Sequence, residues 1–227
     1  MKALLVRPRR LGIDPRWEKE LRQEGFSRIA GVDEAGRGCL FGPVAAAAVI
    51  LADPHGLRGV DDSKQLAEAE RERLFDQIVR RALSWSVAMV DAATIDRVNI
   101  LEASRLAMRL AVERLPLPAD ALLVDAIAIP ASLPQTSIIH GDAVCRSIAA
   151  ASILAKVHRD RTMREWDRLY PGFAIASNKG YGTPVHLQAL QALGPTAEHR
   201  FSYRPVRECC RGALCIGWQD PRQRLFE

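Results

Sequence analysis

Short apolar runs alternate with longer segments that carry apolar residues at helical spacing, and this pattern predicts the elements of the fold. Residues 28–34 and 44–51 are apolar runs, and the AGRGCLFGP segment between them predicts a tight connection, because its glycines and proline favour turns. Residues 84–90 alternate polar and apolar positions, as a half-buried strand does. Two further apolar runs, 121–127 and 136–142, bring the expected strands to five.

Helices are expected where apolar residues recur every three or four positions with charged residues between them. Asp14 and Pro15 suit the start of a first helix, which Gly25 should end. The other helices are expected over residues 67–82, 99–115, 144–169 and 185–193. The order β-β-α-β-α-β-β-α predicts an α/β fold: a mixed five-stranded sheet flanked by helices, with a C-terminal helical segment.

Composition narrows the class of protein. Of the 227 residues, 48% are hydrophobic and 26% charged, which is typical of a globular chain and not of a disordered or fibrous one. The longest apolar run, residues 40–52, contains a glycine and a proline and is too short for a transmembrane helix. The N-terminal sequence has too few apolar residues before its arginines for a secretory signal. A cytoplasmic protein with no membrane partner is therefore expected.

The cysteines point to a reducing compartment. There are five, an odd number, and no C-x-x-C spacing occurs, which argues against both a disulfide framework and a zinc site. Three of them, Cys209, Cys210 and Cys215, lie together in the C-terminal tail, where no further ligand follows at zinc spacing. They are interpreted as incidental thiols.

The positive charge is concentrated at one end of the chain. Residues 151–227 contain 12 Lys and Arg against 7 Asp and Glu, so the whole net charge of +5 lies there. Phosphate neutralisation supplies sequence-independent affinity for nucleic acid, so this distribution favours a polyanionic partner. Arginines outnumber lysines 27 to 5 throughout, however, so a coding bias explains part of the charge equally well.

Acidic residues stand at the ends of three predicted strands: Asp33 and Glu34, then Asp125, then Asp142. The two neighbouring acids of the first strand share one site only if the backbone turns there, because adjacent side chains of a strand point to opposite faces. Gly36 and Gly38 follow at once and allow such a turn. Each acid alone also fits a turn or capping role, which for Asp142 is as good an interpretation as a ligand.

Taken together, the acids predict a metal site. Carboxylates gathered at one edge of a sheet repel one another unless a cation lies among them, and an all-oxygen set of ligands favours Mg²⁺ or Mn²⁺ over zinc. Two such cations activate water and stabilise the leaving oxygen in phosphodiester displacement. That chemistry agrees with a polyanionic substrate.

Several strings of the chain resemble, in order and spacing, ribonuclease HII: GVDEAGRGCLFGPV, DDSKQL, NILEAS, LLVDA, GDAVCRSIAAASILAKVHRDR, NKGYGTPVHLQAL and HRFSYRPV. The resemblance extends from about residue 28 to residue 206. It implies a ribonuclease H-like fold and a two-ion Mn²⁺ or Mg²⁺ endonuclease. Its substrates would be the RNA strand of RNA/DNA hybrids and duplex DNA with single ribonucleotides, cut on the 5′ side to leave 3′-OH and 5′-phosphate ends. Such cuts serve ribonucleotide excision repair.

The resemblance also assigns roles to residues. Four positions match the family's metal-binding catalytic acids: Asp33, Glu34, Asp125 and Asp142. Gly36, Arg37 and Gly38 match the loop whose backbone reads the ribose 2′-hydroxyl, which suits glycines because they let a backbone approach a sugar closely. Tyr181 matches a tyrosine that stacks on the neighbouring deoxyribose, and the alternative interpretation is a partly buried aromatic residue of a turn.

Other polar residues receive weaker roles. Lys64 and Arg146 are candidate phosphate contacts, and each fits a solvated surface charge equally well. Ser147 and Ser152, on the small-residue face of the 144–169 helix, are interpreted as packing residues, because no His/Asp pattern supports a serine nucleophile.

Two positions depart from the family pattern. His140 stands where the family commonly has lysine, and Ala126 stands where glycine often follows the aspartate. The alternative function is therefore a catalytically impaired hybrid-binding protein of the same fold. The expected organisation is an N-terminal extension (1–27), a catalytic domain (28–170) and a C-terminal helical and basic segment packed on it (171–227), in a monomer.

Overall fold

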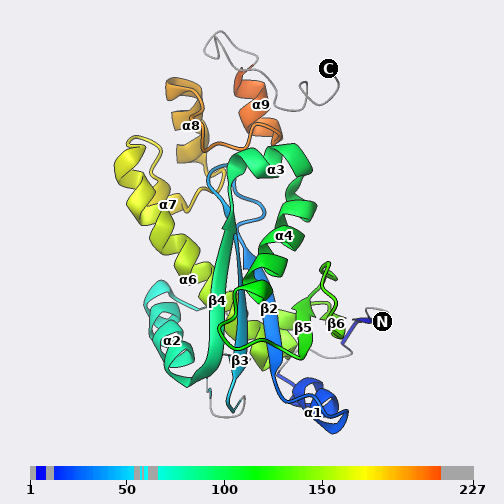
Figure 1. Ribbon diagram of the computed structural model, residues 1–227. Coiled ribbons are helices and arrows are strands. Elements are labelled where there is room, and N and C mark those ends of the chain that lie inside the picture. The colour runs from blue at the N-terminus through cyan, green and yellow to red at the C-terminus, as the bar shows by residue number, and fades with distance from the viewer. Residues whose placement is uncertain (1–3, 9–12, 54–56, 58, 61–65, 211–227) are drawn as a thin grey trace. The chain divides into compact units, whose positions relative to one another are not determined.

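The computed structural model describes residues 4–8, 13–53, 57, 59–60 and 66–210. Within these residues, six strands form one sheet in the order β1-β6-β5-β2-β3-β4 (Figure 1). The strands are β1 (Leu4–Val6), β2 (Ile29–Ala35), β3 (Val44–Leu51), β4 (Ala82–Val90), β5 (Ala121–Asp125) and β6 (Gln135–Ile138). The helices are α1 (Arg16–Gln23), α2 (Glu68–Arg81), α3 (Ala92–Val98), α4 (Ile100–Glu113), α5 (Gly141–Val144), α6 (Arg146–Leu169), α7 (Ile175–Asn178), α8 (Pro184–Leu193) and α9 (Arg204–Cys210).

This architecture confirms the mixed α/β fold class, but the sheet has six strands where the sequence predicts five. The additional strand is β1, which pairs in parallel with β6 and places Leu5 opposite Ser137. It has three residues. A run of that length is too short to show an alternating pattern, and its extended conformation depends on a partner far away in the sequence.

Strand β2 sets the geometry of the sheet edge. It pairs in parallel with β5, with Val32 opposite Val124, and antiparallel with β3, with Asp33 opposite Ala47. Because β2 and β5 are parallel, their carboxyl ends lie at the same edge of the sheet, where parallel sheets commonly collect functional side chains.

Two strands end earlier than predicted, and the backbone gives the reason. Ala126, directly after β5, has a φ of 52°, and His140, shortly after β6, has a φ of 56°. Both values lie in the left-handed region, which interrupts an extended chain and which residues with a Cβ rarely adopt. Glycine is unstrained at such a φ, whereas alanine costs about 1 kcal/mol.

The short helices α3, α5, α7 and α9 are absent from the sequence prediction. Helix α3 illustrates the cause. The Asp91 side chain caps it by accepting the Thr94 N–H at 2.7 Å, and Asn99, with a φ of 71°, separates it from α4. Helices of about seven residues show too little periodicity to be recognised without their caps.

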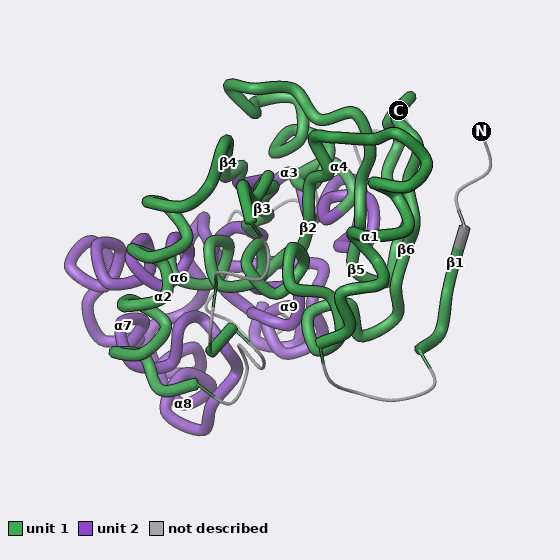
Figure 2. Tube along the Cα trace, turned by 90° about the horizontal axis from the view of Figure 1, so that it is seen from below, with its two compact units in different colours: residues 1–35, 45–88, 105–157 green, residues 36–44, 89–104, 158–227 purple. Residues whose placement is uncertain are grey.

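The chain divides into two compact units (Figure 2). Unit 1 consists of residues 1–35, 45–88 and 105–157, and unit 2 consists of residues 36–44, 89–104 and 158–227. Each unit has its own buried apolar cluster.

In unit 1, the first half of α6 packs closely on the sheet. Gly31 of β2 faces the backbone of α6, and a Cβ at this position would lie 2.1 Å from the Ser147 carbonyl carbon. The alanines of α6, including Ala150, share one buried cluster with Ala47 and Val49 of β3. Small side chains on both elements therefore let the helix lie directly over the face of β2 that carries Asp33.

Unit 2 is built around aromatic residues. Phe41, Met163, Phe173 and Ile175 form one buried cluster, and Leu40, Leu190 and Val206 form another. In the described ranges no helix is both long and apolar enough to cross a membrane. Cys39 and Cys145 are buried thiols, and Cys215 lies outside the described residues.

Candidate active site

The four acids predicted from the sequence all belong to unit 1. Asp33 and Glu34 lie near the end of β2, Asp125 is the last residue of β5, and Asp142 is the second residue of α5. Asp33 is 4% exposed and Asp142 is 6% exposed. A backbone turn was expected at the two neighbouring acids, but both lie within β2, and the left-handed φ of 93° comes only at Gly36.

Electrostatics show that the acids gather around Asp33. Burial raises the pKa of the Asp33 carboxyl well above its ordinary value, and the negative charges of Glu34, Asp125 and Asp142 raise it further. A hydrogen bond from the Ser152 hydroxyl acts in the opposite direction and lowers this pKa. Each of the other three carboxylates therefore lies close enough to repel Asp33.

Backbone amides orient two of the carboxylates. The Glu34 N–H donates to Asp33 Oδ1 at 2.7 Å, and the Gly141 N–H donates to Asp125 Oδ1 at 2.7 Å. The second bond ties the end of β5 to the start of the helix that carries Asp142.

The donor set of this site fits hard divalent cations. Four carboxylates supply only oxygen, the ligand that Mg²⁺ and Mn²⁺ prefer, and a cation relieves the repulsion that burial intensifies. Within the described residues, no three His, Cys, Asp or Glu side chains are already grouped as a metal site. Binding therefore requires the carboxylates to turn toward the ion, away from some of their present backbone partners.

Ser152 is a site residue that sequence analysis misses. It was interpreted as packing, but its hydroxyl donates to Asp33. Ser147 instead donates to the buried Glu18 carboxylate, from its hydroxyl at 2.8 Å and from its N–H at 3.1 Å. The signal for Ser152 is available only once α6 is known to cover the face of β2 that carries Asp33.

The Gly36-Arg37-Gly38 segment, called the reading loop below, lies in unit 2 together with Tyr181. A Cβ added to Gly38 would lie 3.9 Å from Cε1 of the Tyr181 ring, so this ring stands beside the loop. Gly38 is exposed and Tyr181 is 41% exposed. The two features to which the family resemblance assigns sugar recognition are therefore neighbours in unit 2, with Gly38 and the Tyr181 ring accessible and Gly36 buried.

Two buried histidines hold the Tyr181 backbone. The Thr196 N–H donates to His199 Nδ1 at 2.9 Å, so the proton of His199 is on Nε2, which donates to His186 Nε2 at 3.1 Å. His186 Nδ1–H then donates to the Tyr181 carbonyl at 2.8 Å. This chain of bonds requires both imidazoles to be neutral.

We expect the histidine pair to make folding stability depend on pH. Burial lowers the pKa of His186, and burial together with the nearby His186 lowers the pKa of His199 to about 3. Below pH 6.5 the unfolded chain gains protons that the folded chain excludes, so stability is full above that pH and is lost as pH falls toward 3. The contribution of His199 lowers the free energy of unfolding by roughly 2 kcal/mol between pH 7 and pH 5.

Urea unfolding at several pH values measures this effect. His199→Asn should flatten the dependence, since an amide oxygen can replace Nδ1 as the acceptor but does not titrate. His140→Asn is the matched control, because His140 is exposed and asparagine tolerates its left-handed φ. An equally steep dependence in His199→Asn and wild type would refute the role of the pair.

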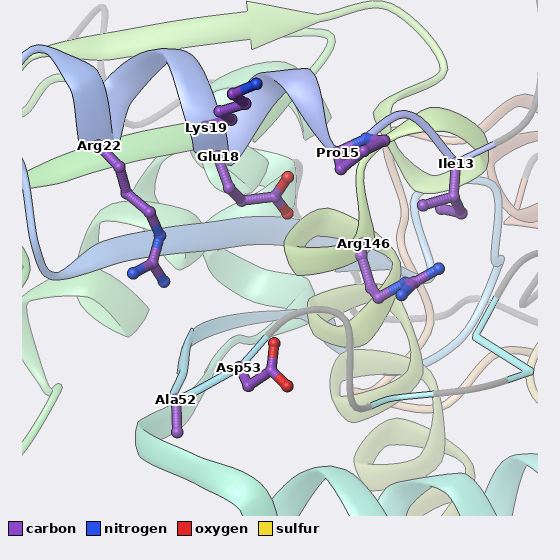
Figure 3. Close-up of a pocket in the computed structure, with 8 residues that line it drawn as sticks. All are labelled: Ile13, Pro15, Glu18, Lys19, Arg22, Ala52, Asp53 and Arg146. Carbon is purple, nitrogen blue, oxygen red and sulfur yellow. The ribbon is translucent and has the colours of Figure 1, made fainter.

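The two candidate phosphate contacts have different outcomes. Lys64 lies outside the described residues. Arg146 is the first residue of α6 and lines a cavity of about 420 Å³ together with Glu18, Lys19, Arg22 and Asp53 (Figure 3). The four acids are not among the residues that line this cavity.

Comparison with known proteins adds a family to this geometry. A family model described as Ribonuclease HII matches residues 30–206. Ribonuclease HII of Solibacter usitatus (strain Ellin6076) is 55% identical over 197 residues, covering 87% of this chain and 86% of that protein. The crystal structure of ribonuclease H2 from Pyrococcus horikoshii OT3 has a TM-score of 0.69 at 26% identity, covering 81% of this chain and 97% of that one. Bst-RNase HIII in complex with Mn²⁺ has a TM-score of 0.59 at 20% identity, over 81% of this chain and 69% of that one, a likeness of fold alone.

Proposed function

The chain belongs to the ribonuclease HII family, and from this premise we propose that it incises duplexes on the 5′ side of a ribonucleotide by two-metal-ion catalysis. Membership makes the chain a ribonuclease H, an enzyme that acts on RNA/DNA hybrids. The proposal extends this activity to single ribonucleotides in duplex DNA, with products that carry 3′-OH and 5′-phosphate ends.

The observation that carries the proposal is the gathering of four carboxylates, three of which raise the pKa of the buried Asp33. The residues that hold the two ions are Asp33, Glu34, Asp125 and Asp142. Bound Mg²⁺ or Mn²⁺ supplies an activated water and stabilises the leaving oxygen. Mn²⁺ is the ion in the complex of Bst-RNase HIII, which shares the fold.

The protein's own groups place the substrate. The Ser152 hydroxyl and the Glu34 N–H both donate to the Asp33 carboxylate and hold it near the end of β2. The reading loop approaches the ribose and its backbone recognises the 2′-hydroxyl, the group that distinguishes RNA from DNA. The Tyr181 ring stacks on the next deoxyribose, and Lys64 and Arg146 contact phosphates.

The proposal also includes the substrates and the setting of the reaction. The partners are RNA/DNA hybrids and ribonucleotide-containing duplex DNA, and the excess of 12 basic over 7 acidic residues in 151–227 supports contacts to their phosphates. The enzyme works as a monomer in the cytoplasm, in removal of ribonucleotides from DNA.

A labelled RNA/DNA hybrid tests the proposal against the binding-only alternative. Incubation with Mn²⁺ should produce a ladder of shorter RNA fragments, and EDTA should suppress it, because the acids act only with their ions. Tight hybrid binding without any cation-dependent fragment would instead identify a hybrid-binding protein that has lost turnover.

Truncating Tyr181 tests whether its ring contacts the deoxyribose next to the ribonucleotide. Loss of one sugar–aromatic contact, comparable to base stacking worth about 1–3 kcal/mol, predicts roughly ten- to hundredfold lower cleavage efficiency for Tyr181→Ala at a lone ribonucleotide. The measurement is kcat/KM on a duplex with one ribonucleotide.

Tyr181→Phe is the matched control, because it keeps the ring and removes only the hydroxyl. It should cleave nearly as well as wild type. Mn²⁺ binding by calorimetry should be the same in all three proteins, since the acids lie in unit 1. Undiminished cleavage by Tyr181→Ala would assign the tyrosine a structural role.

A further inference from the structure

Two arginines of unit 2, Arg159 and Arg200, are fully buried. Burying a guanidinium is costly unless its N–H groups find acceptors, so the identity of those acceptors indicates what the buried charge is for. In both cases the acceptors include backbone carbonyls of one segment, residues 36–43, which begins with the reading loop.

Arg200 binds the reading loop itself. Its Nη1 donates to the Arg37 carbonyl at 2.8 Å and to the Tyr203 hydroxyl at 3.1 Å, while its Nε donates to the Gly42 carbonyl at 2.9 Å. The Tyr203 hydroxyl in turn donates to the Arg37 carbonyl. The Arg37 carbonyl thus accepts two hydrogen bonds, one from Arg200 and one from Tyr203.

Arg159 supports the same segment from a second side. Its Nε donates to the Pro43 carbonyl at 3.0 Å and its Nη2 to the Phe41 carbonyl at 3.1 Å. Its Nη1 donates to the Lys179 carbonyl at 2.7 Å, two residues before Tyr181. The guanidinium therefore connects the segment that starts with the reading loop to the turn that carries the stacking ring.

The direction of these bonds determines what the loop presents. The peptide unit is planar and trans, so its C=O and N–H point in opposite directions. With the Arg37 carbonyl held against Arg200 and Tyr203, the N–H of the exposed Gly38 points away from the buried side. An outward N–H is a donor available to a sugar hydroxyl.

We propose that Arg200 and Arg159 are positioning residues for 2′-hydroxyl recognition: they fix the carbonyls of residues 37, 41, 42 and 43 on the buried side, and so hold the Gly38 amide outward. This inference rests on the proposed function, because it assigns no new substrate and explains how the loop is prepared for the ribose. Preorganised donors avoid the cost of ordering the loop when substrate binds.

Two conservative variants weaken this support. Arg200→Lys keeps the charge, but a single ammonium cannot reach the Arg37 carbonyl, the Gly42 carbonyl and Tyr203 together. Tyr203→Phe removes only the hydroxyl that donates to Arg37. Tyr170→Phe is the matched control, since it makes the same chemical change elsewhere in unit 2.

The experiment measures Kd by fluorescence anisotropy in EDTA, where no strand is cut, for two duplexes that differ by one 2′-hydroxyl. Wild type is expected to prefer the ribonucleotide duplex by roughly fivefold, the value of about one hydrogen bond. In Arg200→Lys and Tyr203→Phe this preference should fall toward one, while the Kd for all-DNA duplex stays within about twofold, because phosphate contacts dominate it. If these residues had only a structural role, the variants would bind both duplexes more weakly, and by the same factor.

The outcomes separate the inference from the function it rests on. If Arg200→Lys and Tyr203→Phe melt like wild type and keep its full preference for the ribonucleotide, the positioning role is wrong and the proposed function stands. If Arg200→Lys fails to fold, Tyr203→Phe decides by the same criterion. If wild type itself neither prefers nor cuts the ribonucleotide duplex with Mn²⁺ added, the proposed function fails and this inference fails with it.

Discussion

Asp33→Asn is expected to abolish cleavage while leaving duplex binding largely intact. Asparagine keeps the shape of the side chain but removes the negative charge that the other three carboxylates repel. Metal-ion catalysis supplies several kcal/mol of transition-state stabilisation, so loss of a central ligand corresponds to roughly a thousandfold or greater fall in kcat. Hybrid binding relies on phosphate contacts elsewhere and should persist.

Single-turnover cleavage of a labelled hybrid with Mg²⁺ measures this prediction. Asp76→Asn is the control, because Asp76 is an exposed acid on α2 and undergoes the same chemical change. It should cleave like wild type. Near-normal cleavage by Asp33→Asn would remove Asp33 from the metal site.

The same variant should be more stable than wild type when metal is absent. Burial and repulsion raise the pKa of Asp33, which means that its ionised form destabilises the folded chain at neutral pH. Asparagine carries no charge to bury. A higher melting temperature in EDTA together with lost activity separates the removal of a functional charge from simple misfolding.

Gly36→Val is expected to have the second largest effect, on both stability and cleavage. Gly36 has a φ of 93°, which costs a residue with a Cβ about 1–2 kcal/mol and a β-branched residue more. A Cβ there would also lie 2.1 Å from Nε of Arg159. This side chain donates hydrogen bonds to three backbone carbonyls, so moving it aside would break them. Strain and overpacking together predict a loss of about 3–5 kcal/mol and at least roughly hundredfold lower cleavage at a lone ribonucleotide.

Gly25→Val measures separately how much stability is lost when a β-branched residue adopts a positive φ. Gly25 has a φ of 97°, and nothing lies within 4 Å of a Cβ added to it. Urea unfolding should show a small loss for Gly25→Val and a much larger one for Gly36→Val. Equal losses in the two variants would mean that the contact with Arg159 does not restrict this position.

The elements that could be predicted from the sequence are those whose pattern is local. Strands β2 and β3 and helices α2 and α6 are long enough for apolar periodicity to show, and the glycines between the strands mark the connection. Strand β1 was missed because its conformation depends on pairing with β6.

The candidate site divides along the same line. Asp33, Glu34 and Asp125 lie near the ends of strands β2 and β5, so their shared edge follows from the strand prediction, whereas Asp142 lies in α5 rather than at the predicted strand end. The sequence pattern did not predict the roles of Ser152, Arg159 and Arg200, because each role depends on the distant segment that the residue packs against. Arg159 and Arg200 look like any other residues of an arginine-rich chain until their burial is known.

Mapping the products of a duplex with one ribonucleotide at a known position tests the central claim most directly. With Mg²⁺ or Mn²⁺ we expect a single cut on the 5′ side of the ribonucleotide, with 3′-OH on the upstream fragment and a 5′-phosphate on the ribonucleotide. EDTA should prevent the cut, and a matching all-DNA duplex should stay intact. A cut on the 3′ side, a 2′,3′-cyclic phosphate end or cleavage that persists in EDTA would contradict attack by a metal-activated water at this site.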